Sequence, residues 1–172
     1  MKNKKQRHFL KLYEPVHDSF ERFCRARAYG DYPFEDLINE SLLVAYSKMD
    51  QLKKSKSFLS FLIGISIRLL ANSKKKCKPE YTSDEDFLQN KADAVNNLDQ
   101  KFEVDLLYNA LSQLKMEQRE CLILFEITGF SIKEIMAIQK SSESAIKQRL
   151  ARGRAELGKI ISNEMNYIKT KV

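Results

Sequence analysis

Tryptophan is absent from this sequence, and residues that break helices are scarce: the 172 residues include five glycines and three prolines. Together with 43% hydrophobic residues, this composition favours a helix-rich chain that can bury a core. Cysteine is scarce as well. Cys24, Cys77 and Cys121 are odd in number and far apart, which argues against a disulfide framework and against a cysteine-ligated zinc site. We expect reduced thiols.

Motifs of enzyme sites are also missing. The sequence has no phosphate-cradling glycine loop, no nucleophile elbow and no H-E-x-x-H pair, and His8 and His17 lack further ligands at metal-binding spacing. No apolar run follows the basic start, and the most apolar stretch, 58–71, is too short to cross a bilayer. These absences predict a cytoplasmic protein that is not an enzyme, has no cofactor or metal and does not insert into a membrane.

Charge is abundant and unevenly distributed. The net charge of +7 and the isoelectric point near 9.2 indicate an acidic partner, with nucleic acid as the first candidate. Residues 1–78 carry a balance of +9, residues 79–105 of −6 and residues 106–172 of +4. The acidic part begins at Pro79 and shows little periodicity. We therefore predict two basic domains, 1–78 and 102–172, joined by an acidic linker at 79–101.

Apolar residues recur at helical spacing on both sides of that linker, so the predicted fold is all-α, with two small helical domains. In the first domain we expect helices over 9–24, with Pro15 near a start or at a kink, over 33–49, and from Phe58 into a lysine-rich end. In the second domain we expect helices over 102–114, with Phe102 on the apolar side, and over 117–127. About seven helices and no strand are predicted in all.

The segment 131–161 has the pattern of two helices joined by a tight turn. Ser131 and Glu134 form an S-x-x-E capping box at the start of the first helix. The second helix has Ser141 or Ser142 as its N-cap and Glu143 in its first turn. This arrangement is typical of a helix-turn-helix, whose second helix enters the DNA major groove. A helical hairpin with a solvated charged face is the plainer alternative.

The second helix of this segment is predicted to have two unlike faces. Ile146, Leu150, Gly153 and Leu157 lie on one stripe at 100° per residue. The other side combines basic, polar and small residues that can approach base edges: Ser144, Lys147, Gln148, Ala151, Arg152 and Arg154.

Two parts of the sequence resemble a known protein family. Residues 36–46, followed by Ser57 to Leu62 and a basic tail, resemble region 2 of a bacterial RNA polymerase sigma factor. Residues 111–122, 129–135 and 145–154 resemble region 4. Two such regions in this order, with only a linker between them, are the layout of the extracytoplasmic-function group of the sigma-70 family.

The resemblance implies roles for named residues. In the family, a region 2 helix docks on the β′ clamp helices of core polymerase, which points here to Asp36, Asn39, Glu40 and Leu43. The −10 promoter element would be bound and opened by Lys53, Lys54, Ser55, Lys56, Ser57 and Arg68. The recognition helix, with the six outer residues given above, would read the −35 element. Core polymerase, including its β flap, promoter DNA and an anti-sigma factor are the implied partners.

Two departures from the family pattern matter. Lys140 stands where the family has a glycine, and a lysine at positive φ costs about 1 kcal/mol, so another turn shape is expected. Ile63, Gly64, Ile67 and Arg68 replace the polar and aromatic residues usual in the −10 helix, so we expect capture of a flipped base by the loop 52–57, with Phe58 and Phe61 in the core.

Two other functions remain open at this stage. One is a stand-alone helix-turn-helix regulator that never joins polymerase, and the other is an interaction module that sequesters a partner without reading DNA. The acidic-polar stripe on 36–43 favours the sigma factor over a simple repressor, which has no use for it.

Overall fold

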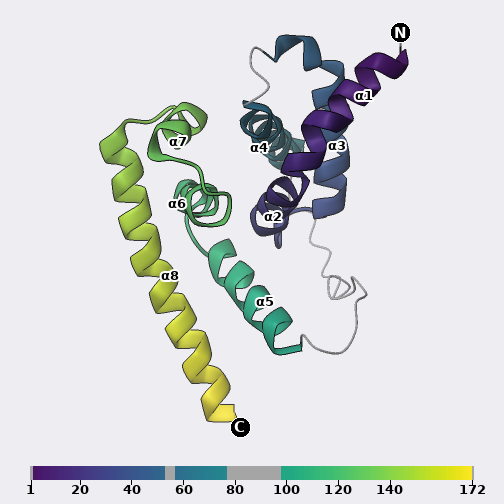
Figure 1. Ribbon diagram of the computed structural model, residues 1–172. Helices are drawn as coiled ribbons and strands as arrows, with labels where there is room; N and C mark the ends of the chain where they lie inside the picture. The colour runs from purple at the N-terminus through teal and green to yellow at the C-terminus, as the bar shows by residue number, and fades with distance from the viewer. Residues whose placement is uncertain (1, 53–56, 77–97, 172) are drawn as a thin grey trace.

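The computed structural model describes residues 2–52, 57–76 and 98–171, and throughout those ranges the regular structure is helical, with no strand (Figure 1). The elements of the N-terminal half are α1 (Lys2–Tyr13), η1 (Glu14–Val16), α2 (His17–Ala28), α3 (Phe34–Ser47), η2 (Met49–Gln51) and α4 (Phe58–Lys76). Those of the C-terminal half are α5 (Leu98–Ser112), α6 (Met116–Leu122), the π-helical turn η4 (Ile123–Ile127), α7 (Ile132–Gln139) and α8 (Glu143–Lys171).

Proline sets the breaks in the N-terminal half. Pro15 lies in the 3-10 turn between α1 and α2, so the predicted helix over 9–24 is divided there. Pro33 is the N-cap of α3 and has an extended backbone, which is the conformation that its ring favours before a helix. The core of this half is formed by side chains such as Phe20, Phe23 and Leu37, which are fully buried.

Close packing of α6 against α8 organises the C-terminal half. The ribbon turns back at Gly129, whose φ of 75° favours glycine, before α7 begins. A Cβ placed on Gly153 of α8 would lie 3.0 Å from the Leu122 side chain. The absence of a side chain at Gly153 therefore allows the two helices to approach each other closely.

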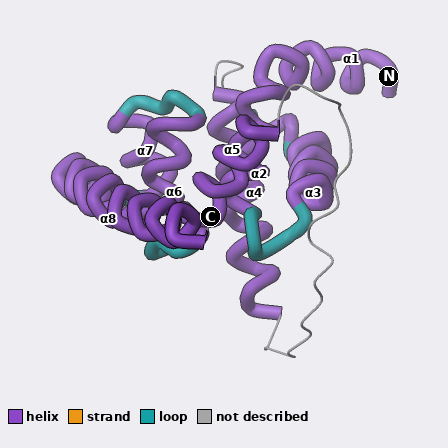
Figure 2. Tube along the Cα trace, turned by 90° about the horizontal axis from the view of Figure 1, so that it is seen from below, coloured by secondary structure: helices purple, strands orange, loops and turns teal. Residues whose placement is uncertain are grey.

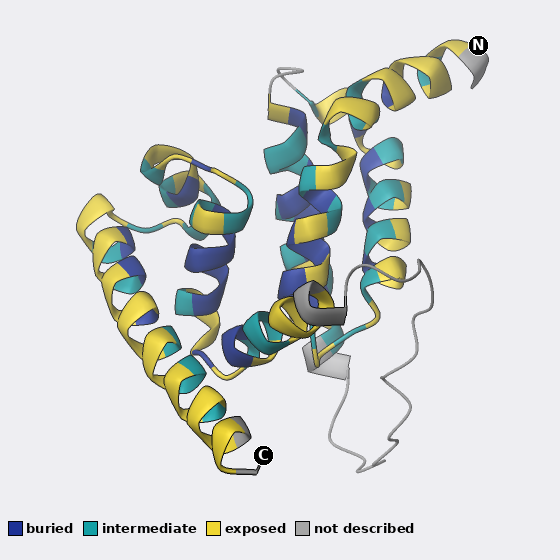
Figure 3. Ribbon diagram, turned by 60° about the horizontal axis from the view of Figure 1, so that its bottom comes forward, coloured by how far each residue is buried: buried dark blue, intermediate teal, exposed yellow. Residues whose placement is uncertain are grey.

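The two halves share one hydrophobic core rather than standing apart. Helix α2 packs against η4 and α5, and α4 packs against α7. Buried residues accordingly run from α2 and α4 into α6, as Figure 3 shows in dark blue. Seen from below, α8 and α3 lie on opposite sides of the molecule (Figure 2). Each half thus keeps one long helix exposed along an outer flank.

Two expectations from the sequence need correction. Helix α5 begins at Leu98, so residues 98–101 of the predicted linker are helical. The rest of that linker, 79–97, lies outside the described ranges. Phe102 was expected on an apolar face, but 53% of its surface is exposed. Helical periodicity predicts which side of a helix is apolar, but not how much of that side another element covers. In α5 the buried residues lie toward the C-terminal end, at Ala110 and Leu111.

Candidate nucleic-acid interface

The first helix of the predicted helix-turn-helix begins as its sequence indicated. The Ser131 hydroxyl accepts a hydrogen bond from the Glu134 amide at 3.4 Å, and the Ser131 amide donates to the Glu134 carboxylate at 2.9 Å. Both halves of the capping box are therefore present. This local arrangement fixes where α7 begins and, with it, the direction in which α7 meets the turn.

The turn between α7 and α8 keeps the left-handed conformation that a glycine would favour. Lys140 has φ 48° and ψ 49°, and among the described residues no other non-glycine residue has a positive φ. The expectation of another turn shape was therefore wrong. The reason lies in the surrounding contacts: the Lys140 and Ser141 amides both donate to the Met136 carbonyl, which closes the helix end.

Arg149 clamps this turn, a role that sequence reasoning missed. Its Nη1 donates to the Gln139 side-chain oxygen and to the Ser141 hydroxyl, each at 2.8 Å. The Gln139 amide in turn donates to the Glu117 carbonyl of α6 at 3.2 Å. The sequence did not indicate this contact, because Gln139 lies in α7 and Arg149 in α8, and helical spacing does not relate residues of different helices.

Helix α8 begins with Ser142 as its N-cap, which decides between the two serines proposed from the sequence. The Ala145 amide donates to the Ser142 hydroxyl at 3.3 Å. Glu143 follows in the first turn, and its pKa is lowered by a hydrogen bond from Lys147 and by the charge of that ammonium group. The ion pair between the two side chains measures 2.6 Å.

The predicted outer face of α8 is exposed along its whole length, while Ile146 and Leu150 are buried against the rest of the half. Two cations of this face are paired within the domain: Lys147 with Glu143, as above, and Arg154 with Glu126. Arg154 donates to Glu126 at 2.9 and 2.6 Å and lies over the Phe125 ring, so its charge is already paired within the domain. The six exposed residues of this face are Ser144, Lys147, Gln148, Ala151, Arg152 and Arg154.

The predicted polymerase-binding stripe is also exposed. Asp36, Asn39, Glu40 and Leu43 lie on the outer side of α3, and 72% of the Leu43 surface is open to solvent. Glu40 accepts a hydrogen bond from the Tyr32 hydroxyl at 2.9 Å, which raises the pKa of Tyr32. A leucine this exposed beside two carboxylates gives the stripe an apolar centre with an acidic edge.

Only part of the predicted −10 surface can be placed. Ser57 and Arg68 are exposed, whereas Lys53, Lys54, Ser55 and Lys56 lie outside the described residues. Phe58 is buried as predicted, but Phe61 is only half-buried, so its ring faces solvent in part.

A cluster of four charged residues, three of them buried, joins the two halves, and no sequence pattern pointed to it. From α6, the Arg119 guanidinium donates to the Ala26 and Tyr29 carbonyls at the end of α2, both at 2.9 Å, and to Asp31 at 3.3 Å. It thus satisfies carbonyls that a helix end leaves without partners. The second pair of the cluster joins Arg27 of α2 to Glu120 of α6 at 3.5 Å.

This cluster is stabilised incompletely. Arg27 and Arg119 are 2% and 4% exposed, and one nitrogen of each lacks a hydrogen bond: Nη1 of Arg27 and Nε of Arg119. Burial and the neighbouring Arg27 charge lower the pKa of Arg119, while Asp31 opposes that shift. Burying charges costs free energy that ion pairs offset only when their geometry is good. The charge pairing across this contact is therefore only partly satisfied.

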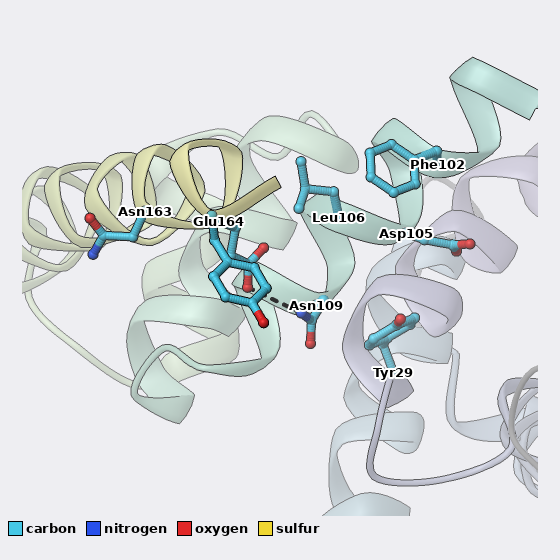
Figure 4. A pocket seen from close by; sticks show the side chains of 8 residues that line it. Tyr29, Phe102, Asp105, Leu106, Asn109, Asn163 and Glu164 are labelled. Carbon is cyan, nitrogen blue, oxygen red and sulfur yellow. Dashed lines mark hydrogen bonds between the residues drawn. The ribbon is translucent and has the colours of Figure 1, made fainter. Parts of the chain in front are cut away.

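An open cavity of about 490 Å³ lies beside this contact (Figure 4). Its walls come from α5, from the last turns of α8 and from Tyr29, which follows α2. Glu164 of α8 accepts hydrogen bonds from Asn109 at 3.1 Å and from Gln113 at 2.8 Å, so its carboxylate serves to attach α8 to α5. We assign this cavity a structural role.

The described part of the chain contains neither a metal-binding cluster nor a candidate membrane span. No three histidine, cysteine or carboxylate side chains come together there as a metal site would require. Nor does any helix within those ranges combine the length and apolar character of a membrane span.

Comparison with known proteins bears on both halves. Residues 105–157 match the family described as Sigma-70, region 4. The chain is 22% identical to the ECF RNA polymerase sigma factor SigM of Mycobacterium tuberculosis, over 95% of this chain and 80% of SigM. It is 26% identical to the ECF RNA polymerase sigma factor EcfG of Rhodopseudomonas palustris, over 74% of this chain and 70% of EcfG.

The fold has a counterpart among solved structures. The sigma factor RpoE from Bartonella quintana, in complex with the anti-sigma factor NepR, superimposes with a TM-score of 0.69. The match covers 94% of this chain and 98% of RpoE at 21% identity. The two chains therefore share the fold of both halves, including α1 to α4, which the match to region 4 does not reach.

Proposed function

The chain belongs to the sigma-70 family, in its extracytoplasmic-function group, and we propose that it binds core RNA polymerase and directs it to a class of promoters. The observation that carries this proposal is the exposed outer face of α8 within a helix-turn-helix that matches region 4. Sigma factors recognise promoters and catalyse no reaction, so we assign no catalytic residue. The site of action is the cytoplasm, where polymerase and promoter meet.

We propose a separate role for each half of the chain. Residues 1–78 act as the region 2-like domain, which binds core polymerase and the −10 element. Residues 102–172 act as the region 4-like domain, which binds the −35 element. The stand-alone regulator is the less suitable alternative, because the exposed stripe around Leu43 is suited to a protein partner and not to phosphates.

Within α8, we propose that Lys147, on leaving its ion pair with Glu143, and Gln148 approach base edges, and that Arg152 and Arg154 hold phosphates. A Gln148→Ala variant should relax preference at one or two positions of the −35 element, by about 1–3 kcal/mol of discrimination. Arg152→Ala should weaken binding to every sequence alike and reduce the salt slope by about one unit. Arg154, already paired with Glu126, should have a smaller effect than Arg152.

Polymerase docking is tested by reversing charge on α3. Asp36→Lys combined with Glu40→Lys should abolish binding to purified core polymerase in a pull-down and abolish run-off transcription. The matched control is Glu103→Lys with Glu117→Lys, which changes two exposed carboxylates of the other half by the same charge. If the α3 variant binds polymerase as the parent does, the protein is not a sigma factor that docks through α3.

The −10 surface is assigned to Ser57, Arg68 and the lysines of 53–56. The cations of this surface would hold the phosphates of single-stranded DNA. Because the surface has few aromatic residues to stack on bases, little binding energy offsets the cost of strand separation, which is a few kcal/mol per flipped base. The triple variant Lys53→Ala, Lys54→Ala and Lys56→Ala should therefore form open complexes poorly on duplex promoters and better on pre-melted ones. Equal activity of parent and variant on duplex templates excludes the loop.

An anti-sigma factor is a further partner that we propose, since RpoE, which shares this fold, was solved with one. Co-purification of the full chain from its host with a tightly bound small protein, followed by loss of run-off transcription when that protein is added back, tests this partner.

A further inference from the structure

The structural role of the cavity beside the contact between the halves uses only part of Glu164. Both amide hydrogen bonds that attach α8 to α5 are accepted by one oxygen of this side chain, Oε1. The other oxygen, Oε2, is buried without a hydrogen bond. Within the described part of the chain Glu164 also forms no ion pair. The cavity is therefore lined by a carboxylate whose charge no neighbouring cation offsets.

A second carboxylate lies at the same cavity. Asp105 of α5 lines it, is exposed, and likewise pairs with no cation among the described residues. Burial, and after it the charges of Asp105 and Glu164, raise the pKa of Tyr29 in the cavity wall, so both carboxylates act on the same ring. No described residue that lines the cavity is basic. The cavity is thus negative in a chain whose net charge is +7.

Aromatic rings form much of the remaining wall. Phe102 of α5 and Tyr167 of α8 line the cavity together with Tyr29. In the view of Figure 4 the Asp105 side chain lies between those of Phe102 and Tyr29. Phe102 and Tyr167 expose 53% and 61% of their surface. Open rings that gather at one cavity, beside a few polar groups, indicate a ligand site more than rings scattered singly over a surface.

We propose that this cavity binds a small alkylammonium ion, with aromatic rings against its alkyl groups and two carboxylates offsetting its charge. The rings are those of Tyr29, Phe102 and Tyr167, and the carboxylates are those of Asp105 and Glu164. Aromatic faces attract organic cations, and they attract them more strongly where water is partly excluded.

The size and chemistry of the cavity suit such an ion. A volume of about 490 Å³ is in the range of small-molecule sites. A metal ion would need several close ligands, whereas the described residues bring no three histidine, cysteine or carboxylate side chains together. Because Tyr29 belongs to one half and the other walls to the second half, the ion binds only while the halves are packed together, and it stabilises that arrangement.

The test uses choline as the probe and its neutral carbon isostere, dimethylbutanol, as the control for charge. Binding of each to the full chain is measured by isothermal titration calorimetry at about 50 mM salt, where screening is weak. The variants are Asp105→Asn and Phe102→Leu. The matched control is Glu103→Gln, which removes one negative charge from an exposed position of α5 that does not line the cavity. All three positions are exposed, so unchanged helical circular dichroism is expected and is checked.

Choline should bind the parent chain and raise its melting temperature, and dimethylbutanol should do neither. Asp105→Asn should lower the affinity for choline about tenfold, because it removes a charge next to the cation. Phe102→Leu should lower it about three- to fivefold, which is what a cation–π contact at an exposed site contributes. Glu103→Gln should bind choline as the parent does.

Absence of choline binding to the parent overturns the proposal. Equal binding of dimethylbutanol overturns it in favour of a merely apolar cavity, and an equal loss in Glu103→Gln overturns it in favour of a general surface charge. A lysine side chain carries the same chemical group, so a short peptide with one lysine among alanines is titrated as well. If that peptide binds more tightly than choline, the cation belongs to a protein partner and the small-molecule assignment fails.

Discussion

At the scale of single residues, Lys140 is held in a conformation that its Cβ disfavours. Its left-handed backbone costs about 1 kcal/mol relative to glycine, which meets no such clash. Lys140→Gly should therefore raise the free energy of unfolding by about 0.5–1 kcal/mol, measured by urea denaturation. Lys140→Ala keeps the Cβ and is the control. If alanine stabilises as much as glycine, the gain comes from loss of the lysine side chain and not from the backbone.

Two buried thiols make stability depend on alkaline pH. Burial raises the pKa of Cys121 to about 11 and raises the pKa of Cys24 as well, from an ordinary value of 9.0. Because the folded state then holds protons that the unfolded state releases, stability is complete below pH 9 and falls as pH rises through 9 to 11. Cys77 lies outside the described residues.

Urea denaturation at pH 7.5, 9 and 10 should show this loss. In a Cys24→Ala and Cys121→Ala variant the loss should shrink, although the variant is less stable at every pH. The remaining slope would come from tyrosines such as Tyr13 and Tyr108, whose pKa values burial also raises. An identical pH dependence in parent and variant would show that the thiols do not contribute.

Residue-scale roles could be predicted from the sequence when they were local. The capping box at Ser131 and Glu134 was predicted and is confirmed, because all its atoms lie within four residues. The shape of the turn at Lys140 was not predicted, because the prediction considered the strain of a left-handed lysine and not the hydrogen bonds by which the Lys140 and Ser141 amides close the helix end at Met136. Arg149 escaped notice for a different reason, since its partners lie across the turn.

At the scale of helices, the contact of α8 with α6 depends on a missing side chain. Gly153→Ala would place a methyl group 3.0 Å from Leu122, and overpacking of this kind costs about 1–3 kcal/mol. The better helix propensity of alanine stabilises by roughly 0.5–1 kcal/mol, so the free energy of unfolding should fall overall, as measured by thermal or urea unfolding.

Gly158 offers a control on the same helix. A Cβ there meets nothing within 4 Å, so Gly158→Ala should stabilise by up to about 1 kcal/mol. The two substitutions are chemically identical and differ only in what surrounds them. If both stabilise equally, α6 and α8 are free to shift apart and Gly153 does not set their distance.

The helices of the C-terminal half illustrate what periodicity can and cannot give. The inward stripe of α8, including Ile146 and Leu150, was predicted and is buried. The exposed Phe102 was not, because a stripe seen in the sequence does not say whether another element covers it. A π-helical turn, η4, likewise has no signal in the spacing of 123–127.

At the scale of the whole molecule, the packing of the halves onto each other was not predictable from the sequence. A change in composition at Pro79 predicted two domains with a linker, and helical spacing gave each domain its own core. The ion cluster of Arg27, Asp31, Arg119 and Glu120 joins residues about ninety positions apart. No periodicity relates such residues, and buried charges are not what a core is expected to contain.

This packing has a consequence for promoter binding. The −10 and −35 positions are about 25 base pairs apart by their names, which is about 85 Å of DNA at 3.4 Å per base pair. A compact chain of this length has a radius of gyration of about 16 Å. If residues 1–78 bind the −10 element and residues 102–172 the −35 element, as proposed, they cannot do so together on a straight promoter while α2 remains packed on η4 and α5.

Arg119→Ala should accordingly favour the separated form. Removing one member of a buried ion cluster costs about 3–5 kcal/mol when the rest stays buried, but here the remaining charges regain water if the halves part. We expect a larger radius of gyration by small-angle scattering with unchanged helical circular dichroism, and core polymerase affinity equal to or tighter than that of the parent, because opening no longer opposes binding. Arg154→Ala is the control, since it removes an arginine–glutamate pair inside one half. A radius of gyration that stays at the parent value would show that apolar contacts alone hold the halves together.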